Sequence, residues 1–377
     1  MGYSAPGQSV EPSRIAGPRQ GPNGLTVAVT PDMRSTNRYQ ELLASALEQR
    51  GIRVHFPGQL GGRRPLLRAL LSRQFDVLHL DWIHPYVSAE TLPKSLLKST
   101  IFVLKLLLAR LLGCRIVWTV HNVTGHDARF GSLERTVSGL VAALAHGLVV
   151  HFPAAEQIVR SSFRVSPAKE VYVAHHGHYI DVYPRGSANQ GEETQRAPSP
   201  PLMVLTFGLV RPYKRIEELM MALRMLKGND VHIRVRGMAS DEEYAAELAC
   251  LGRDDNRIDL DLGFIEDESV ARLYDTADLV AITQTDTLTS GSLILAMSMG
   301  KPVVAARTAH AEYLLGDGEG GVLYTSGDLE ELASALESLT DRRDELSGMG
   351  SANQRAIAYH TWSRMAEGVE RAYRGTK

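Results

Sequence analysis

Two short stretches of this sequence combine glycine, hydroxyl groups and positive charge in a way that suits a phosphate group. The first is Thr289-Ser290-Gly291-Ser292, which precedes an apolar segment of helix length. The first N–H groups of a helix have no partners within it and carry partial positive charge. Gly291 lets an anion approach the backbone closely, and the two serine hydroxyls add hydrogen-bond donors. The same pattern also suits an ordinary helix with serine at its N-cap, so the interpretation depends on other residues.

The second stretch, residues 207–215, follows a predicted strand and includes Gly208, Arg211 and Lys214. Arginine offers a forked set of donors and lysine a compact charge, and both suit a diphosphate. One charge pair at about 4 Å contributes roughly 4 kcal/mol at an effective dielectric near 20, before desolvation, whereas a helix N-terminus contributes only about 0.3–1 kcal/mol. We therefore expect Arg211 and Lys214 to supply most of the attraction, while residues 289–292 orient the diphosphate. The alternative is that both charges are solvated in a loop.

A third group of polar residues, in the first half of the chain, could bind a sugar or move a proton. His121, Asn122, His126 and Asp127 follow a predicted buried strand. Imidazole and carboxylate groups at such a place can hydrogen-bond sugar hydroxyls or act as a general base. We predict that His121, His126 and Asp127 are catalytic. The predicted contacts to the sugar or the acceptor are Asn37, Asp81 and Asn122.

The elements that must position these residues form two similar halves. Continuous β-branched runs alternate with amphipathic helices, which predicts parallel sheets covered on both faces. The fold class is therefore α/β, with two Rossmann-like, doubly wound domains that face each other across a cleft. We expect a disordered tail over 1–24, a first domain over 25–184, a polar, proline-rich linker over 185–201, a second domain over 202–360 and a returning C-terminal helix over 361–377.

Composition and charge restrict the class of function. The chain has 377 residues, of which 44% are hydrophobic, and a formal net charge of −2, which gives no reason to expect nucleic-acid binding. Its two cysteines, Cys114 and Cys250, lie far apart and predict neither a disulfide framework nor a zinc site, so a reducing cytoplasm fits best. No GxGxxG follows the first strand of either half, which disfavours a nicotinamide dehydrogenase.

The segment from residue 94 to residue 110 is a helix candidate in which short apolar runs alternate with Lys94, Lys98, Lys105 and Arg110. Each apolar run is too short to span a bilayer. One face of this helix is basic and the rest is apolar, so it could lie on an anionic membrane surface. It could equally be an amphipathic helix that covers the sheet. The predicted location is cytoplasmic, with peripheral contact to the inner face of the cell membrane.

The three groups of residues together resemble the GT-B glycosyltransferases, and most closely glycosyltransferase family 4 and its neighbours. The resemblance extends from about residue 25 onward and is stronger in the second domain. It implies that the second domain binds a nucleotide-diphospho sugar and the first domain the acceptor. Arg211 and Lys214 would then hold the donor diphosphate, with the Gly291 turn at the diphosphate or the sugar and His121 near the transferred sugar. The C-terminal helix around Trp362 would brace the first domain.

One departure from family 4 affects the mechanism. The family commonly has two glutamates eight positions apart, and these positions hold Thr287 and Leu295 here. Their absence puts donor-sugar recognition by such a pair in doubt and weakens the inference that the anomeric configuration is retained. An inverting reaction would need a base, for which Asp127 or His126 is the first candidate and Asp81 the reserve. No DxD motif is evident near the predicted cleft, so we expect no metal and no cofactor beyond the nucleotide sugar, which is a substrate.

The sequence thus predicts a glycosyltransferase that moves a sugar from a UDP- or GDP-linked donor to a lipid-linked or saccharide acceptor in polysaccharide or glycolipid biosynthesis. Two alternatives stay open at this point. One is a nucleotide-sugar 2-epimerase, which would turn over the donor without an acceptor. The other is a non-catalytic partner subunit with the same fold, which would tolerate the loss of Arg211 and Lys214.

Overall fold

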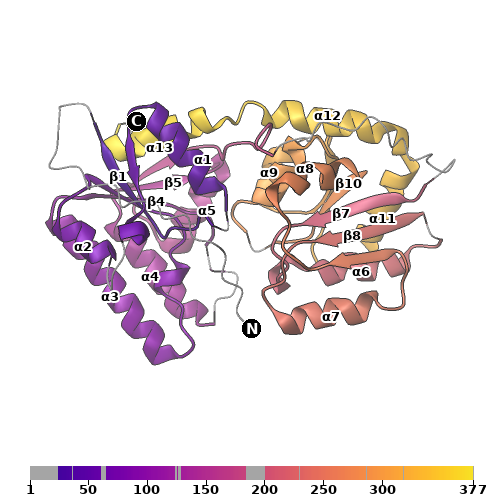
Figure 1. Cartoon of the computed structure of the whole chain (residues 1–377), viewed down its shortest axis with the longest axis horizontal. Coiled ribbons are helices and arrows are strands. Elements are labelled where there is room, and N and C mark those ends of the chain that lie inside the picture. The colour runs from indigo at the N-terminus through magenta and orange to yellow at the C-terminus, as the bar shows by residue number, and fades with distance from the viewer. Residues whose placement is uncertain are drawn as a thin grey trace, which may run out of the picture.

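Two six-stranded parallel sheets, one in each half of the chain, form the framework of the molecule (Figure 1). The computed structural model describes residues 24–35, 37–60, 65–123, 125, 129–183, 200–228, 230–285, 287–316 and 318–376. The strand orders are β2-β1-β3-β4-β5-β6 and β12-β11-β10-β7-β8-β9. In both sheets the order reverses beside the first strand, which is the doubly wound arrangement that places ligands at the carboxyl edge of the strands. The predicted fold class is confirmed.

The first sheet is buried on both faces. Successive residues of a strand point to opposite sides, and in β1 Val27 and Val29 pack into one core cluster while Ala28 packs into the other. Helices α2 to α5 cover one face, and α1 with the C-terminal α13 covers the other. The strands are β1 Thr26–Thr30, β2 Arg53–His55, β3 Val77–Leu80, β4 Arg115–Thr119, β5 Gly147–Val150 and β6 Glu170–Val173. The helices are α1 Tyr39–Gln49, α2 Pro65–Leu71, α3 Leu92–Leu111, α4 Gly131–Leu144 and α5 Pro153–Phe163, with short 3-10 turns η1 Pro57–Leu60 and η2 His84–Tyr86.

The second sheet repeats this arrangement. Helices α6, α7 and α11 pack on one face and α8, α9 and α10 on the other. The strands are β7 Leu202–Phe207, β8 Val231–Arg236, β9 Ile258–Asp261, β10 Leu279–Ile282, β11 Val303–Ala306 and β12 Gly321–Tyr324. The helices are α6 Ile216–Met225, α7 Glu242–Gly252, α8 Asp267–Asp275, α9 Gly291–Ser298, α10 Ala309–Leu315, α11 Leu329–Asp341 and α12 Leu346–Ile357, with 3-10 turns η3 Pro212–Lys214 and η4 Arg343–Glu345.

The C-terminal segment connects the two halves. Helix α12 runs along the second domain and α13, Trp362–Arg374, lies on the first, as the yellow ribbon in Figure 1 shows. Trp362 packs so closely on Gly177 that a Cβ there would lie 2.3 Å from its ring, and its Nε1–H donates to the carbonyl of His178. Farther along, Tyr373 hydrogen-bonds His79 at 2.6 Å. The C-terminal helix therefore contacts His79 of β3, inside the first domain. The predicted tail and linker lie almost entirely outside the described residues, which exclude 1–23 and 184–199, so the domain limits stay a prediction.

The two domains touch at their facing edges. Leu288, from the loop after β10, packs into the core cluster of the first domain. The Phe152 ring lies 5.1 Å from that of His310, and Tyr313 hydrogen-bonds His175 at 3.3 Å. Arg38, before α1, pairs with Asp267 of α8. The loop that carries residues 287–290 therefore lies directly against the end of the first sheet.

Candidate functional site

The second domain brings Gly208, Lys214 and Ser292 together at the end of its first strand. Lys214 Nζ donates to Ser292 Oγ at 2.9 Å, which joins the loop after β7 to the start of α9. Gly208 has φ +113°, and a Cβ on it would lie 3.5 Å from Lys214 Nζ. Arg211 is half-buried one turn earlier, where its carbonyl accepts from the Lys214 N–H at 2.9 Å. Two loops 78 residues apart in sequence thus form one cationic turn.

Lys214 is 8% exposed, and this burial lowers the pKa of its ammonium group to about 8. Removal from water disfavours the charged form, and the neutral hydroxyl of Ser292 compensates only partly. An anion bound beside Nζ would favour the charged form of the ammonium group again. The lysine is therefore buried rather than solvated in a loop.

The turn at residues 289–292 is fixed from three sides. Ser290 caps α9, since its Oγ accepts from the Leu293 N–H at 3.2 Å, and it also accepts from Gln284 Nε2 at 2.8 Å. The Ser290 N–H donates to His310 Nδ1 at 3.1 Å. At Gly291 a Cβ would meet nothing within 4 Å, so the space in front of the helix is open. The ordinary capping interpretation is correct, and it leaves that space for a ligand.

Two buried polar atoms beside this turn have no hydrogen-bond partner among the described residues. They are Gln284 Oε1 and Thr289 Oγ1. A buried polar group without a partner costs about 1–3 kcal/mol, so such atoms are expected where a ligand completes the site. Leu295, in contrast, is 6% exposed and packs into the core cluster behind α9. The family's second glutamate thus has an apolar core residue in its place, whereas Thr287 is half-buried in the loop.

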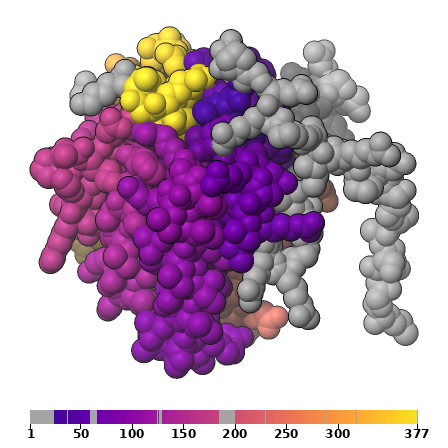
Figure 2. Space-filling model, turned by 90° about the vertical axis from the view of Figure 1, so that its left-hand side faces the viewer, coloured from indigo at the N-terminus to yellow at the C-terminus, as the bar shows by residue number. Residues whose placement is uncertain are grey.

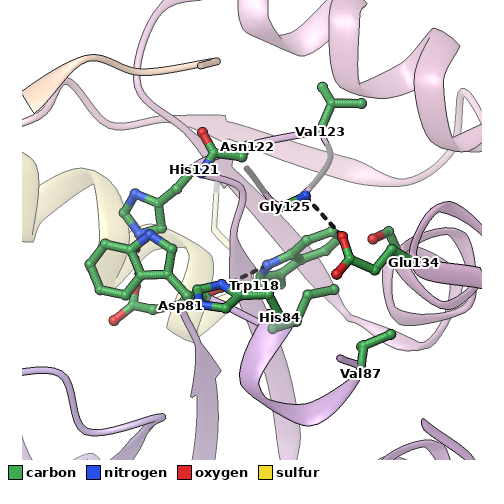
Figure 3. A pocket seen from close by; sticks show the side chains of 12 residues that line it. Asp81, His84, Val87, Trp118, His121, Asn122, Val123, Gly125 and Glu134 are labelled. Atoms are coloured by element: carbon green, nitrogen blue, oxygen red, sulfur yellow. Dashed lines mark hydrogen bonds and ion pairs between the residues drawn. The ribbon is translucent and has the colours of Figure 1, made fainter. Parts of the chain in front are cut away.

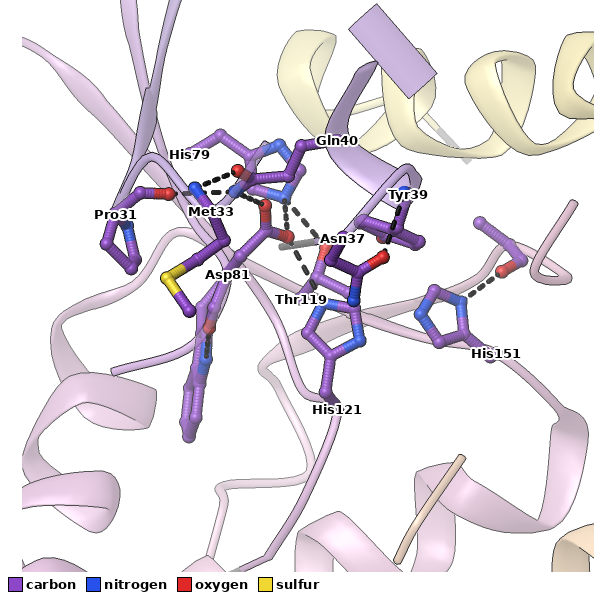
Figure 4. Close-up of polar contacts among 12 residues, drawn as sticks. Pro31, Met33, Asn37, Tyr39, Gln40, His79, Asp81, Thr119, His121 and His151 are labelled. Atoms are coloured by element: carbon purple, nitrogen blue, oxygen red, sulfur yellow. Dashed lines mark hydrogen bonds and ion pairs between the residues drawn. The ribbon is translucent and has the colours of Figure 1, made fainter. Parts of the chain in front are cut away.

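The first domain places Asp81 at the centre of a buried polar network (Figure 4). Asp81 is 1% exposed, and its Oδ2 accepts from Gln40 Nε2 at 2.6 Å. Its Oδ1 lies 3.2 Å from His121 Nε2 and 3.7 Å from His79 Nε2. Burial alone would raise the pKa of this carboxyl, but His79, His121 and Gln40 outweigh it, and the net pKa is below the ordinary value. Asp81 is therefore a carboxylate at neutral pH.

That charge determines which nitrogen of His121 carries a proton. An ionised carboxylate only accepts hydrogen bonds, so Nε2 must be the protonated nitrogen of a neutral His121, and Nδ1 then has a free lone pair. The ring is held by packing as well. It stacks on Trp82 at 4.3 Å with an interplanar angle of 12°, and the edge of Tyr39 meets it at 4.8 Å. His121 is thus oriented as a base or hydrogen-bond acceptor.

A pocket opens beside this pair (Figure 3). Asp81, Trp82 and His121 line one end. Toward the other end lies Glu134, in the first turn of α4, whose Oε2 accepts from the Gly125 N–H at 3.0 Å. The remaining lining residues are Ile83, His84, Val87, Trp118, Asn122, Val123 and Ser138. The lining thus combines polar groups, at both the His121 end and the Glu134 end, with apolar side chains.

The predicted site residues are only partly assembled by the structure. His121, Asp81 and Asn122 share the pocket, and Asn37 lies nearby, where its Oδ1 accepts from the Tyr39 N–H at 2.9 Å. His126 and Asp127 lie outside the described residues, so their role as the base stays a prediction. Among the residues that the structure describes, no group of three or more His, Cys, Asp or Glu side chains could hold a metal ion. Sequence reasoning missed Gln40, Glu134, His151, Gln284 and His310.

Comparison with known proteins adds independent information. A family model described as "Glycosyl transferases group 1" matches residues 201–342, which is the half that contains Lys214 and the α9 turn. A GDP-mannose:glycolipid 4-beta-D-mannosyltransferase of Xanthomonas campestris is 28% identical over 283 residues, which cover 73% of each chain. A D-inositol 3-phosphate glycosyltransferase of Corynebacterium diphtheriae is 28% identical over 241 residues, which cover 60% of this chain and 55% of the relative.

Solved structures show the same architecture. The Anabaena protein HepE in complex with UDP-glucose superposes with a TM-score of 0.71 at 18% identity, covering 93% of this chain and 99% of that one. Sucrose-phosphate synthase from Thermosynechococcus elongatus also gives a TM-score of 0.71, at 17% identity, covering 93% and 98%. At these identities the likeness establishes the fold, and together with the family match it confirms the resemblance stated from the sequence.

Proposed function

We propose that this chain, a glycosyltransferase of the GT-B fold, transfers a sugar from a nucleoside-diphosphate sugar to a lipid-linked or saccharide acceptor. The observation that carries the proposal is the pairing of two unlike sites at one domain junction. The buried Lys214 and the open N-terminus of α9 form an anion site on one side. The Asp81–His121 pair and its pocket form a proton-accepting site on the other. Glycosyl transfer needs both.

The donor half would bind the diphosphate at the loop after β7. Lys214 Nζ and the first N–H groups of α9 provide fixed positive charge there, and Arg211 adds a forked donor. Negative charge on the diphosphate grows as the bond to the sugar breaks, so these groups stabilise the transition state more than the ground state. Thr289 Oγ1 and Gln284 Oε1 would complete their hydrogen bonds with the donor. We infer that protein charge does this without a metal.

The acceptor half would supply the base. The acceptor O–H gives its proton to His121 Nδ1 while its oxygen attacks the anomeric carbon, and the bond from that carbon to the phosphate oxygen breaks, with its electron pair leaving on the nucleoside diphosphate. Asp81 holds the Nε2–H and stabilises the imidazolium that forms. Attack from the face opposite the leaving group inverts the anomeric centre. The absence of a carboxylate at Thr287 and Leu295 is consistent with this route.

The relatives suggest the substrate classes. The Xanthomonas campestris relative is named for GDP-mannose and a glycolipid, and the structural relative HepE was solved with UDP-glucose. We therefore propose a GDP- or UDP-linked hexose as donor and a glycolipid as the first acceptor class to test. If the donor sugar is α-linked, a β-linked product such as the relative's name describes requires inversion.

We further propose that α3 brings the protein to the membrane that contains such an acceptor. Within the described residues no helix is long and apolar enough to cross a bilayer. The buried side of α3 is narrow, consisting of Ser95, Ser99, Phe102, Leu106 and Ala109. Opposite it lies a row of exposed apolar side chains, 40–85% exposed: Leu92, Leu96, Leu97, Ile101, Leu104, Leu107 and Leu111. The helix thus covers the sheet and still presents an apolar outer face.

Charge and position favour a lipid surface over a protein partner for this face. Lys94 and Lys98 are exposed along one side of the apolar row, and Leu140 of α4 extends the row at 46% exposure. Figure 2 shows the first domain from its outer side, with purple atoms, the colour of residues near 100, at its lower end. Binding to vesicles with about 30% phosphatidylglycerol, but not to pure phosphatidylcholine, is the expected result. Leu97→Ser with Leu104→Ser should abolish it while transfer to a water-soluble acceptor continues.

The function itself is tested in two steps, first by the effect of nucleotides on thermal unfolding and then by an assay of sugar transfer. GDP or UDP, or one of their hexose conjugates, should raise the midpoint of unfolding, because a ligand that binds only the folded state stabilises it by mass action. The stabilising donor is then incubated with an alkyl glycoside and, separately, with a free disaccharide, and product is detected by mass spectrometry. A glycosylated product supports the proposal. Donor turnover without acceptor would favour the epimerase alternative, and no shift with any nucleotide would contradict the donor site.

A further inference from the structure

His151, directly after β5, has a hydrogen-bond acceptor that nothing in the described structure uses. Its Nδ1 lies 2.8 Å from the carbonyl oxygen of Ala174. Because a carbonyl only accepts, Nδ1 must carry the proton, and the neutral ring then has a lone pair on Nε2. His151 is 2% exposed, and Nε2 is buried with no hydrogen-bond partner among the described residues. The orientation and tautomer of this ring are thus fixed by one bond.

The unpartnered nitrogen faces the reaction centre. The His151 ring lies 5.2 Å from that of His121 and 5.9 Å from that of Tyr39. Figure 4 shows its second nitrogen on the side toward Asn37 and His121, opposite the dashed bond to the backbone. The next residue, Phe152, packs on His310, which holds the Ser290 N–H of the donor turn. His151 is therefore close to the proposed base and is one residue away from a contact with the donor turn.

Burial and neighbouring imidazoles explain why this ring stays neutral. Removal from water lowers the pKa of His151 well below its ordinary value, and the nearby His121 and His176 act in the same direction. A neutral His151 cannot bind phosphate by charge and cannot donate through Nε2. Its remaining chemistry is to accept one hydrogen bond from an O–H or N–H group.

We propose that His151 Nε2 accepts a hydrogen bond from a hydroxyl of the transferred sugar and so selects the donor. A buried acceptor without a partner is unfavourable, and the transferred sugar, which the proposed function places beside His121, would bring its hydroxyls to the side on which Nε2 lies. The inference rests on the proposed function. A site that hydrogen-bonds a substrate hydroxyl discriminates strongly against the analogue that lacks it, because the protein group is then left unpaired.

Two substitutions separate this role from the structural bond to Ala174. The amide of asparagine in His151→Asn reaches about where Nδ1 is, so it keeps the bond to the Ala174 carbonyl and removes the acceptor. The longer amide in His151→Gln reaches about where Nε2 is and can accept in its place. His176→Asn is the matched control, because His176 is also buried in the same cluster and its Nδ1 lies 2.8 Å from the Gly177 carbonyl oxygen. Thermal unfolding of each variant reports whether the fold is kept.

The measurement is kcat/KM for GDP-mannose or UDP-glucose, whichever the wild-type enzyme uses, and for the monodeoxy analogues of its sugar. Wild-type enzyme should discriminate against one analogue by roughly tenfold or more, as expected for one buried hydrogen bond. His151→Asn should lose that discrimination, His151→Gln should regain part of it, and His176→Asn should keep it. Unchanged discrimination in His151→Asn would overturn this assignment alone. A wild-type enzyme that turns over no nucleotide sugar would overturn the proposed function, and this assignment with it.

Discussion

The two sides of the cleft are built in opposite ways. On the first domain, the buried Gln40 and His79 contact the Asp81 carboxylate, and the half-buried Trp82 stacks on the His121 imidazole. On the second domain, a backbone turn at Ser290–Ser292 is held by capping bonds, and one lysine supplies the charge. In the proposed mechanism the first arrangement controls the position of a proton, and the second controls the position of an anion.

This difference follows from what each side has to do. A base must keep one tautomer and one orientation, and only directional contacts from several elements can hold an imidazole in that way. An anion site needs positive potential and open backbone N–H groups, which a helix start provides locally. Substitutions on the first side should therefore affect the chemical step, and those on the second side should affect donor binding.

Asp81→Asn is expected to produce the largest effect. An asparagine amide can donate to His121 Nε2, which would move the ring proton to Nδ1 and remove the lone pair that accepts the acceptor's proton. In serine proteases a substitution that leaves the histidine in the wrong tautomer lowers kcat by about 10⁴, and the loss of a general base costs about 10²–10⁴. We expect kcat to fall within that range in steady-state assays.

Binding of the nucleotide, measured as a thermal shift, is the internal control for Asp81→Asn. Because the proposed diphosphate site lies on the second domain, the shift of the unfolding midpoint by GDP or UDP should be the same in Asp81→Asn and wild type. A variant that loses nucleotide binding along with kcat would show that the two sides are not independent. A variant that keeps kcat would remove Asp81 and His121 from the mechanism.

Lys214→Met is expected to have the next largest effect, on binding. A charged hydrogen bond contributes about 1.5–3 kcal/mol, so affinity for GDP or UDP measured by calorimetry should fall by roughly 10- to 100-fold. Stability of the free protein should not fall with it, because a buried ammonium group is replaced by an apolar side chain of similar length. Lys301→Met, at the far end of α9, is the matched control and should leave nucleotide affinity unchanged. Equal affinity in both variants would contradict the anion site.

The pH dependence of nucleotide binding tests the same lysine without a mutation. In the free protein the pKa of Lys214 is about 8, below the ordinary value, because the group is buried. A bound diphosphate favours the charged form, so binding above about pH 8 takes up a proton and affinity falls by up to about tenfold per pH unit. In the free protein the sign is opposite. The unfolded state binds more protons between about pH 8 and about pH 10, so this group's contribution to stability rises over that window. Calorimetry in buffers of different ionisation enthalpy measures the proton uptake, which Lys214→Arg should eliminate.

The same contrast explains what could be predicted from the sequence. The grouping of Gly208, Lys214 and Ser290–Ser292 could be predicted because these residues lie in loops that follow strands, where the local sequence pattern is informative. His121 and Asp81 could be found for the same reason. Gln40 could not, because it lies on α1, 41 residues from Asp81, and only the sheet order brings the two together. His151 is a single histidine after an apolar strand, and its unused acceptor becomes visible only once the tautomer is fixed by Ala174. Gln284 and His310 likewise gain their meaning from contact with Ser290.

Ser290→Ala should have the smallest effect on function. It is informative because stability, nucleotide affinity and kcat should change by different amounts. Loss of an N-cap costs about 1 kcal/mol, and the amide of Gln284 would lose its acceptor as well, so we expect the free energy of unfolding to fall by roughly 1–2 kcal/mol. The backbone N–H groups at the start of α9 remain, since an alanine can still lead into the helix. Nucleotide affinity should therefore fall by less than in Lys214→Met, and kcat with saturating donor should stay within a few-fold of wild type. Denaturant unfolding and steady-state kinetics on one preparation decide this. A loss of kcat as large as that in Asp81→Asn would mean that the turn acts in the chemical step, and the division between the two sides of the cleft would not hold.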